Sequence, residues 1–282
     1  MLKSISKTVS GENTSDGAGV KLKRIIGTRT LLQIDPFMLL DEFKNEHADD
    51  YSAGFPPHPH RGFETVTYML EGNFRHEDSR GNVGELGPGS VQWMTAGKGI
   101  VHSEMPMQNA GRIWGFQLWV NLPKKLKWVE PSYQDMHSKM IPEHIEPHKK
   151  IRVIAGEYMG KKSIHTSAIP FQYYDVHLQN SESFKTPISA NHTTLLYVYQ
   201  GELQIDLNPE DKNSKIVPES NLVLFSDEGD EISVTATSAI TRFIFLSAEK
   251  INEPIARGGP FVMNTMSEIH QAFSDYQMGL IG

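Results

Sequence analysis

Short apolar segments separated by turns run through almost the whole chain. Residues 20–26 alternate at first between apolar and polar positions, as a half-buried strand does. Further segments that are rich in β-branched, aromatic or aliphatic residues lie at 65–72, 90–95, 113–122, 151–155, 173–178, 194–199 and 241–246. Turn residues separate these segments roughly every eight to twelve positions, a spacing that is typical of sandwiches and barrels. The pattern therefore predicts an all-β fold.

The end of the chain carries a different pattern. Thr265 and Glu268 have the spacing of a capping box, and Ile269, Ala272 and Phe273 follow at helical spacing before a glycine. We therefore expect a short C-terminal α-helix of about three turns.

The strand pattern weakens between residues 123 and 150, where prolines and lysines accumulate. His137, His144 and His148 lie there at irregular spacing in a polar setting, so we interpret them as solvated surface residues. We therefore predict an N-terminal barrel at residues 1–132, a linker at 133–148, and a C-terminal barrel at 149–282 that ends in the helix.

An internal repeat supports two copies of one β unit. Tyr68-Met-Leu-Glu-Gly72 matches Tyr197-Val-Tyr-Gln-Gly201 at a fixed offset in the sequence. A second, weaker match places Asp227-Glu-Gly opposite Gly97-Lys-Gly. The chain is thus predicted to hold two tandem β modules.

Composition and charge exclude several classes of binding site and partner. The chain has 282 residues, a net charge of −7 and no cysteine, so disulfides and thiolate metal sites are excluded. The acidic balance argues against nucleic-acid binding, which favours a basic surface. No apolar run is long enough to cross a membrane, and the start lacks the features of a secretory signal. We expect a soluble, cytoplasmic monomer, or a nuclear protein if the source is eukaryotic.

Candidate metal ligands fall in two segments of the first β module. His58 and His60 are two residues apart, as are His102 and Glu104, and residues two apart in a strand point to the same face. Three imidazoles and a carboxylate suit one divalent transition metal such as Fe(II), and also Mn, Ni, Co or Zn. In the second copy the repeat places only non-ligands opposite these four residues, namely Pro187, Ser189, Ile232 and Val234.

Longer motifs extend this picture to a resemblance. The segments Pro-His-Pro-His-Arg-Gly-Phe-Glu-Thr-Val at 57–66 and Gln-Trp-Met-Thr-Ala-Gly-Lys-Gly-Ile-Val-His-Ser-Glu-Met-Pro at 92–106 resemble those of pirins, which belong to the cupin superfamily. The resemblance covers nearly the whole chain. It implies a bicupin, two tandem cupin barrels with a metal only in the N-terminal one. It also implies iron as the metal and His58, His60, His102 and Glu104 as its ligands.

The resemblance also shapes the expectations for neighbouring residues. In many cupins a glutamate near position 64 is a ligand, whereas the pirin pattern assigns that role to Glu104. We therefore interpret Glu64, expected on the same face as His58 and His60, as a residue that orients a ligand histidine or acts as a base. A purely structural hydrogen bond or salt bridge remains an equal alternative. His76 lies past the turn at Gly72, and we do not expect it to reach the site.

Two functions follow from the resemblance. As a quercetin 2,3-dioxygenase, the protein would bind a flavonol and O₂ and release carbon monoxide and a depside. The base would be Glu64, or Glu104 if it can leave the metal transiently. The alternative is a non-enzymatic metal- or redox-sensing regulator that binds a transcription factor or a metabolic enzyme.

Overall fold

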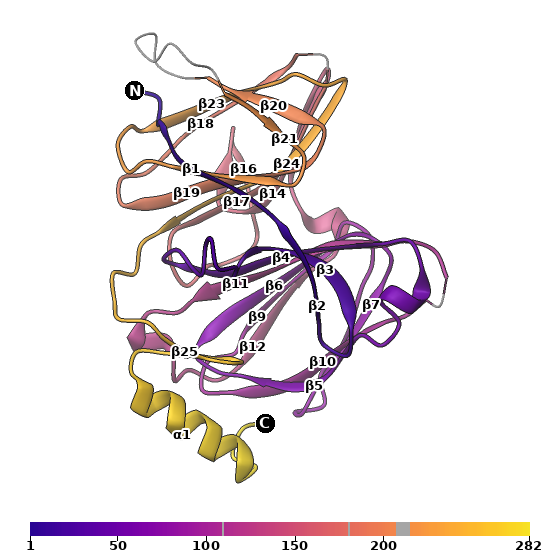
Figure 1. Ribbon diagram of the computed structural model, residues 1–282, viewed down its shortest axis with the longest axis vertical. Helices are drawn as coiled ribbons and strands as arrows, with labels where there is room; N and C mark the ends of the chain where they lie inside the picture. The colour runs from indigo at the N-terminus through magenta and orange to yellow at the C-terminus, as the bar shows by residue number, and fades with distance from the viewer. Residues whose placement is uncertain (109, 180, 207–214) are drawn as a thin grey trace. The chain divides into compact units, whose positions relative to one another are not determined.

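The computed structural model of the protein (Figure 1) describes residues 1–108, 110–179, 181–206 and 215–282. These residues divide into two compact units. We call Glu12–Ser138 with Ile251–Gly282 the first module, and Met1–Gly11 with Lys139–Lys250 the second module.

The first module consists mainly of a larger and a smaller sheet, both antiparallel. The larger sheet has the order β12 (Ser132–Met136), β9 (Val91–Thr95), β6 (Phe63–Glu71), β11 (Ile113–Asn121), β4 (Phe37–Asn45), β3 (Val20–Ile26) and β2 (Glu12–Asp16). The smaller sheet has the order β5 (Phe55–His60), β10 (Ile100–Pro106), β7 (Phe74–Asp78) and β8 (Val83–Leu86).

Burial in these strands follows their place in the sheet. β6 and β11 lie in the middle of the larger sheet and are buried along most of their length, with Val66, Tyr68, Phe116 and Leu118 inaccessible to solvent. β2 lies at the edge and is fully exposed. A central strand is covered on both faces, so its apolar run is continuous rather than alternating.

The second module also has a larger and a smaller antiparallel sheet. The larger sheet has the order β1 (Ile5–Ser10), β22 (Asn221–Phe225), β19 (His192–Gln200), β24 (Ile240–Glu249), β17 (Phe171–Gln179), β14 (Lys149–Ala155) and β13 (Glu143–Glu146). The smaller sheet has the order β18 (Ser183–Pro187), β23 (Glu231–Ala236), β20 (Glu202–Ile205) and β21 (Lys215–Pro218). Its core contains a cluster of aromatic rings from Tyr174, Phe184, Phe243 and Phe245.

The two modules have matching strand orders, with one exchange at the edge. Next to β9 the first module places β12, whereas next to the corresponding β22 the second module places β1 from the start of the chain. The division of the chain therefore differs from the predicted boundaries. Residues 1–11 join the second module, residues 251–282 join the first, and the predicted linker contains most of β12 and all of β13.

The C-terminal segment closes one side of the first module. It forms the hairpin β25 (Ala256–Gly258) and β26 (Phe261–Met263), beside which Figure 1 shows the helix α1 (Met266–Gln277) in yellow. Thr265 and Glu268 form the predicted capping box, and Ile269 is buried against Phe261. The all-β fold with a C-terminal helix is thus confirmed. The remaining short elements are the hairpin β15 (Glu157–Tyr158) and β16 (Lys161–Lys162) and the 3-10 helices η1 (Ala48–Asp50), η2 (Lys124–Leu126) and η3 (Ser138–Met140).

An ion pair ties this helix to the strand that carries two of the histidines. Arg61 follows β5 directly, and its Nη1 donates to Asp275 Oδ2 of α1 at 2.6 Å, while its Nε donates to the Lys98 carbonyl at 2.6 Å. The Arg61 side chain is buried, so its charge needs the carboxylate partner that Asp275 supplies. The helix therefore fixes the end of β5.

Candidate metal centre

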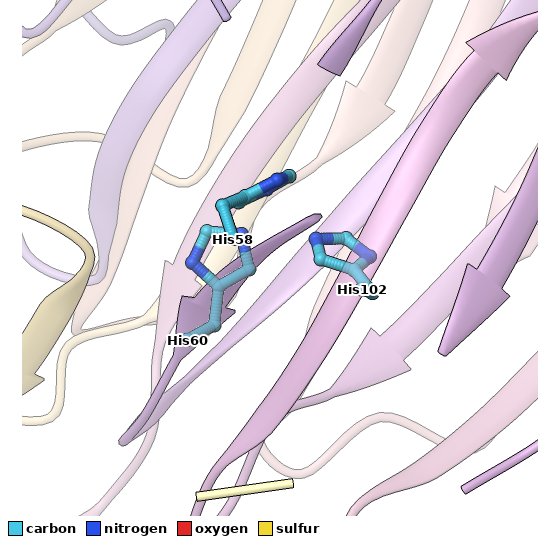
Figure 2. A group of neighbouring side chains, drawn as sticks. All are labelled: His58, His60 and His102. Carbon is cyan, nitrogen blue, oxygen red and sulfur yellow. The ribbon is translucent and has the colours of Figure 1, made fainter. Parts of the chain in front are cut away.

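Two neighbouring strands of the smaller sheet bring three histidines together. His58 and His60 point to one face of β5, and antiparallel pairing places His102 of β10 directly opposite His58. Their ligand nitrogens all lie within 4.8 Å of one another. Figure 2 shows the three rings facing a common point. The predicted histidine cluster therefore forms in the structure.

Hydrogen bonds set the direction of each ring. His58 Nδ1 lies 2.8 Å from the Pro56 carbonyl, and His60 Nδ1 lies 3.4 Å from the Pro260 carbonyl. A carbonyl only accepts, so Nδ1 carries the proton in both rings and Nε2 keeps its lone pair. In the described part of the chain, His102 Nε2 is buried and has no hydrogen-bond partner. The cluster therefore presents three nitrogen lone pairs.

The electrostatic surroundings keep the buried rings neutral. Burial holds the pKa of His60 and of His102 well below the usual value, and the neighbouring histidines lower it further. Neutral imidazole is the form that binds metals.

A fourth histidine supports the cluster from behind. His76 lies on β7, which pairs with β10, and its Nε2 is 2.6 Å from His102 Nδ1. Since His102 Nε2 faces the cluster, its Nδ1 carries the proton and donates to His76. The expectation that His76 stays away from the site was wrong. The alternation in β7, where Phe74 and His76 are buried and Arg75 is exposed, is the sequence signal that points inward.

Glu104 lies near the cluster but does not belong to the compact group of three. Its Oε1 is 2.7 Å from Thr67 Oγ1, which is also 2.7 Å from Gln117 Oε1. One hydroxyl proton serves one acceptor, so we assign it to Glu104 and turn the Gln117 amide so that its NH₂ donates to Thr67. Thr67 and Gln117 thereby hold the carboxylate in place.

Glu64 lies elsewhere than the sequence suggested. β5 ends at His60 and β6 begins at Phe63, because Gly62 between them has a φ of +87° and turns the chain into the other sheet. A side chain at Gly62 would meet the Val262 carbonyl at 2.0 Å. The expectation that Glu64 shares a face with His58 and His60 was therefore wrong. Thr95 Oγ1 donates to Glu64 at 2.7 Å, and burial raises the pKa of this carboxyl.

A cavity of about 530 Å³ lies beside the cluster and lies within the size range of small-molecule sites. His58, His60 and Glu104 line it directly, and Glu64 is not among its lining residues. Its apolar wall includes the rings of Phe43, Phe55, Phe74 and Trp119. The lining also contains polar side chains from Asp16, Arg24, Asp41, Gln117 and Arg257.

Family models match both halves of the chain. The model described as Pirin matches residues 19–120, and the model described as Pirin C-terminal cupin domain matches residues 173–282. The chain belongs to the pirin family.

Pirin relatives match over nearly their full length. A pirin-like protein from Caulobacter vibrioides is 45% identical, covering 98% of this chain and 98% of that protein. Human pirin is 40% identical, covering 98% of this chain and 92% of that protein. The crystal structure of a quercetin 2,3-dioxygenase from Acinetobacter baumannii superposes with a TM-score of 0.90 at 33% identity, covering 100% of this chain and 99% of that one. The predicted bicupin fold and the resemblance to pirins are confirmed.

The second cupin module of this pirin-family chain has different residues at the positions of the cluster. Thr186 pairs with Ile232 in the smaller sheet as His58 pairs with His102. The repeat alignment had placed Pro187 opposite His58, one residue further on. None of the residues that take these places is a histidine or a carboxylate, as the repeat predicts.

The pirin cluster fits a divalent transition metal. Three imidazoles with converging nitrogens are a common ligand set, and His102 Nε2, which has no hydrogen-bond partner among the described residues, is an atom that a metal would satisfy. The His76 bond to His102 supplies the outer support that metal-binding histidines usually have. Within the described residues, no helix is long and apolar enough to span a membrane.

Proposed function

We propose that this pirin-family protein is a metal-dependent dioxygenase that cleaves flavonols of the quercetin type with O₂. The observation that carries the proposal is that two histidines of the three-nitrogen cluster line an aromatic cavity of about 530 Å³. The similarity to the Acinetobacter baumannii quercetin 2,3-dioxygenase supports the reaction class.

We assign His58, His60, His102 and Glu104 as the ligands of one divalent transition metal. Fe(II) is our first choice, with Mn, Ni, Co and Zn as alternatives. Thr67 engages Oε1 of Glu104, so Oε2 is the oxygen that we assign to the metal. When bound, the metal supplies Lewis-acid activation of the flavonol oxygens and an open position for O₂.

The cavity wall binds and orients the substrate. Phe43, Phe55, Phe74 and Trp119 offer flat apolar surfaces for the rings of a flavonol. Their packing also excludes water from the reacting centre, which strengthens every electrostatic contact there. The chain thereby holds the flavonol central ring next to the histidines.

The proton of the flavonol 3-hydroxyl needs an acceptor in this cavity. We assign Glu104 as that base, since it lines the cavity and Thr67 fixes its position; its Oε2 would accept the proton while it is not bound to the metal. Glu64, the other carboxylate predicted for catalysis, is bonded to Thr95 outside the cavity lining, so we assign it no proton transfer. In the overall reaction both atoms of O₂ enter the products, and the central ring is opened with release of carbon monoxide.

The test is reconstitution under nitrogen with Fe(II), followed by quercetin and air. We expect loss of the flavonol absorbance with matching O₂ uptake and carbon monoxide release. His58→Ala should abolish all three signals, whereas His137→Ala, a change of an exposed histidine in the same module, should leave them unchanged.

Turnover no faster than that of free Fe(II), with the metal still bound to the protein, would overturn the dioxygenase. That outcome would leave the metal- or redox-sensing regulator implied by the family resemblance. Repeating the assay with Mn, Ni, Co and Zn would identify the metal that supports turnover.

A further inference from the structure

Two arginines line the cavity, and only one of them is neutralised by carboxylates. Arg24 Nε and Nη2 donate to the two oxygens of Asp41 at 2.9 and 2.7 Å. Arg24 Nη2 also donates to Asp16 Oδ2 at 2.6 Å. A bidentate pair with a second carboxylate beside it leaves Arg24 fully compensated.

Arg257 has a different environment. Its Nη1 donates to the Met38 carbonyl at 2.9 Å, and its Cζ lies 5.2 Å from the centre of the Trp119 ring. Among the residues that the structure describes, no carboxylate forms an ion pair with it. Burial lowers the pKa of Arg257 and Arg24 nearby lowers it further, whereas Asp41 and Asp16 raise it. The half-buried guanidinium therefore has carboxylates near it but no ion pair, among the described residues, that occupies its donors.

The contact of Arg257 with the rest of the protein occupies few of its N–H donors. The bond to Met38 ties the C-terminal segment to β4 with one N–H group. A guanidinium carries five N–H donors in a planar fork that matches a carboxylate or another anionic oxygen. The fork also lies at a cavity wall rather than inside the core. Arg257 is thus equipped to bind an anion inside the cavity.

Trp119 relates this cation to the histidine cluster. Its ring is 5.2 Å from Arg257 Cζ and 5.2 Å, centre to centre, from the His60 ring. The distance from the Arg257 guanidinium to the His60 ring is therefore no longer than the sum of these two distances. A ligand of one or two fused aromatic rings can lie along Trp119 and reach both.

We propose that Arg257 binds an anionic oxygen of the ligand, so that the cavity selects planar aromatic molecules that carry a carboxylate or a phenolate. The end of the ligand at the histidines rests on the proposed function, whereas the Arg257 contact does not need turnover. A flavonol meets the requirement when one of its ring hydroxyls is ionised.

The test compares two probes of one shape, a dihydroxynaphthalene carboxylate and the matching neutral carboxamide. Their dissociation constants are measured by calorimetry with the full chain, both metal-free and loaded with Zn(II), which undergoes no redox change. We expect the carboxylate to bind about ten to a hundred times more tightly than the carboxamide. Arg257→Met should remove this preference by weakening the carboxylate alone, and Arg257→Lys should retain part of it.

Arg75→Met is the matched control. Arg75 is an exposed arginine of the same module, outside the cavity lining, and its removal changes the net charge equally. It should preserve the preference. Equal weakening of both probes in Arg257→Met, or no change, would overturn the proposal. The dissociation constants of the metal-free protein test the Arg257 contact even if Zn(II) does not bind or quercetin is not cleaved. Failure of the proposed function is therefore distinguished from failure of this proposal.

Discussion

The two modules place different side chains on one arrangement of strands. In the smaller sheet of the first module, His102 of β10 lies opposite His58 of β5. In the corresponding sheet of the second, Ile232 of β23 lies opposite Thr186 of β18. Ile232 is part of the apolar core of the second module, whereas His102 faces two further histidines. One scaffold thus supports a polar centre in one copy and a packed core in the other.

The difference has an energetic side. Burying His102, His76 and Glu104 removes polar groups from water, and each then needs a partner such as the His76–His102 bond. Burying Ile232 and Val234, which take the places of His102 and Glu104, is favourable by itself. We infer that the first module gives up packing stability for its site, while the second keeps it.

The largest expected effect comes from deleting the ends of the chain, since each end belongs to the module that the rest of the chain would not suggest. Deleting residues 251–282 removes the hairpin and the helix, and with them the apolar cluster of Phe261 and Ile269 that packs against Val101. We expect the first module to lose cooperative folding and metal binding while the second stays protected, as measured by hydrogen exchange with mass spectrometry. Deleting residues 1–11 should instead expose β22 in the second module. Identical exchange patterns for both deletions would contradict the division.

The next effect separates a ligand from its apolar counterpart. His102→Ala should reduce bound metal to near zero, because one of three converging nitrogens is lost. Ile232→Ala should leave metal content unchanged and lower the free energy of unfolding by about 2–5 kcal/mol, because it opens a cavity in a closed core. Metal analysis and denaturant titration check the pair. Loss of metal in both variants would contradict the view that only the first module holds the metal site.

We expect a buried histidine, His165, to make the second module sensitive to acid. Burial lowers the pKa of His165 from 6.5 to about 4. The unfolded chain therefore takes up this proton near pH 6.5 and the folded chain only near pH 4, so stability is lost as the pH falls through that window. His165→Phe should flatten the decline by about 2 to 3 kcal/mol.

Urea unfolding at several pH values, followed in the second module by hydrogen exchange, measures this change. Replacing the exposed His270 by Phe is the control and should leave the pH profile as it is. An unchanged slope in His165→Phe would assign the acid sensitivity to other groups.

The smallest of these effects concerns His76. His76→Phe keeps the ring but removes the acceptor for His102 Nδ1, so we expect metal affinity to fall by about ten- to a hundredfold. His76→Gln keeps an acceptor and should lose less. Competition with a chelator measures both. If His76→Phe and His76→Gln lower the metal affinity equally, the hydrogen bond to His102 contributes nothing beyond the packing of the side chain.

Local sequence patterns were sufficient to predict most of the secondary structure and the meeting of the three histidines. Alternation and turn spacing predicted the strands, the capping box predicted α1, and same-face spacing predicted that His58, His60 and His102 meet. Each of these features depends on residues close in sequence or on one pairing of neighbouring strands. The repeat also placed Ile232 opposite His102, and the pairing of β18 with β23 agrees with that match.

The failures involve long-range pairing or a single turn. Gly62 redirects the chain between β5 and β6, which moves Glu64 away from the face of His60. The contact of His76 with His102 needs the register of β7 against β10. The exchange of edge strands β1 and β12 depends on partners that are far away in the sequence. Periodicity carries no information about such registers.

The exchange of chain ends also dictates an order during synthesis. The ribosome makes the body of the histidine-bearing module first, yet the segment that completes it, residues 251–282, emerges only after the whole of 139–250. Proteins usually mature from the N-terminal domain onward. Here the segment that completes the earlier half follows residues 139–250 in the sequence, so the carbonyl of Pro260 can reach His60 only after those residues have been made. We therefore expect the nascent chain to hold the three histidines in an unfinished fold until the other half has been made.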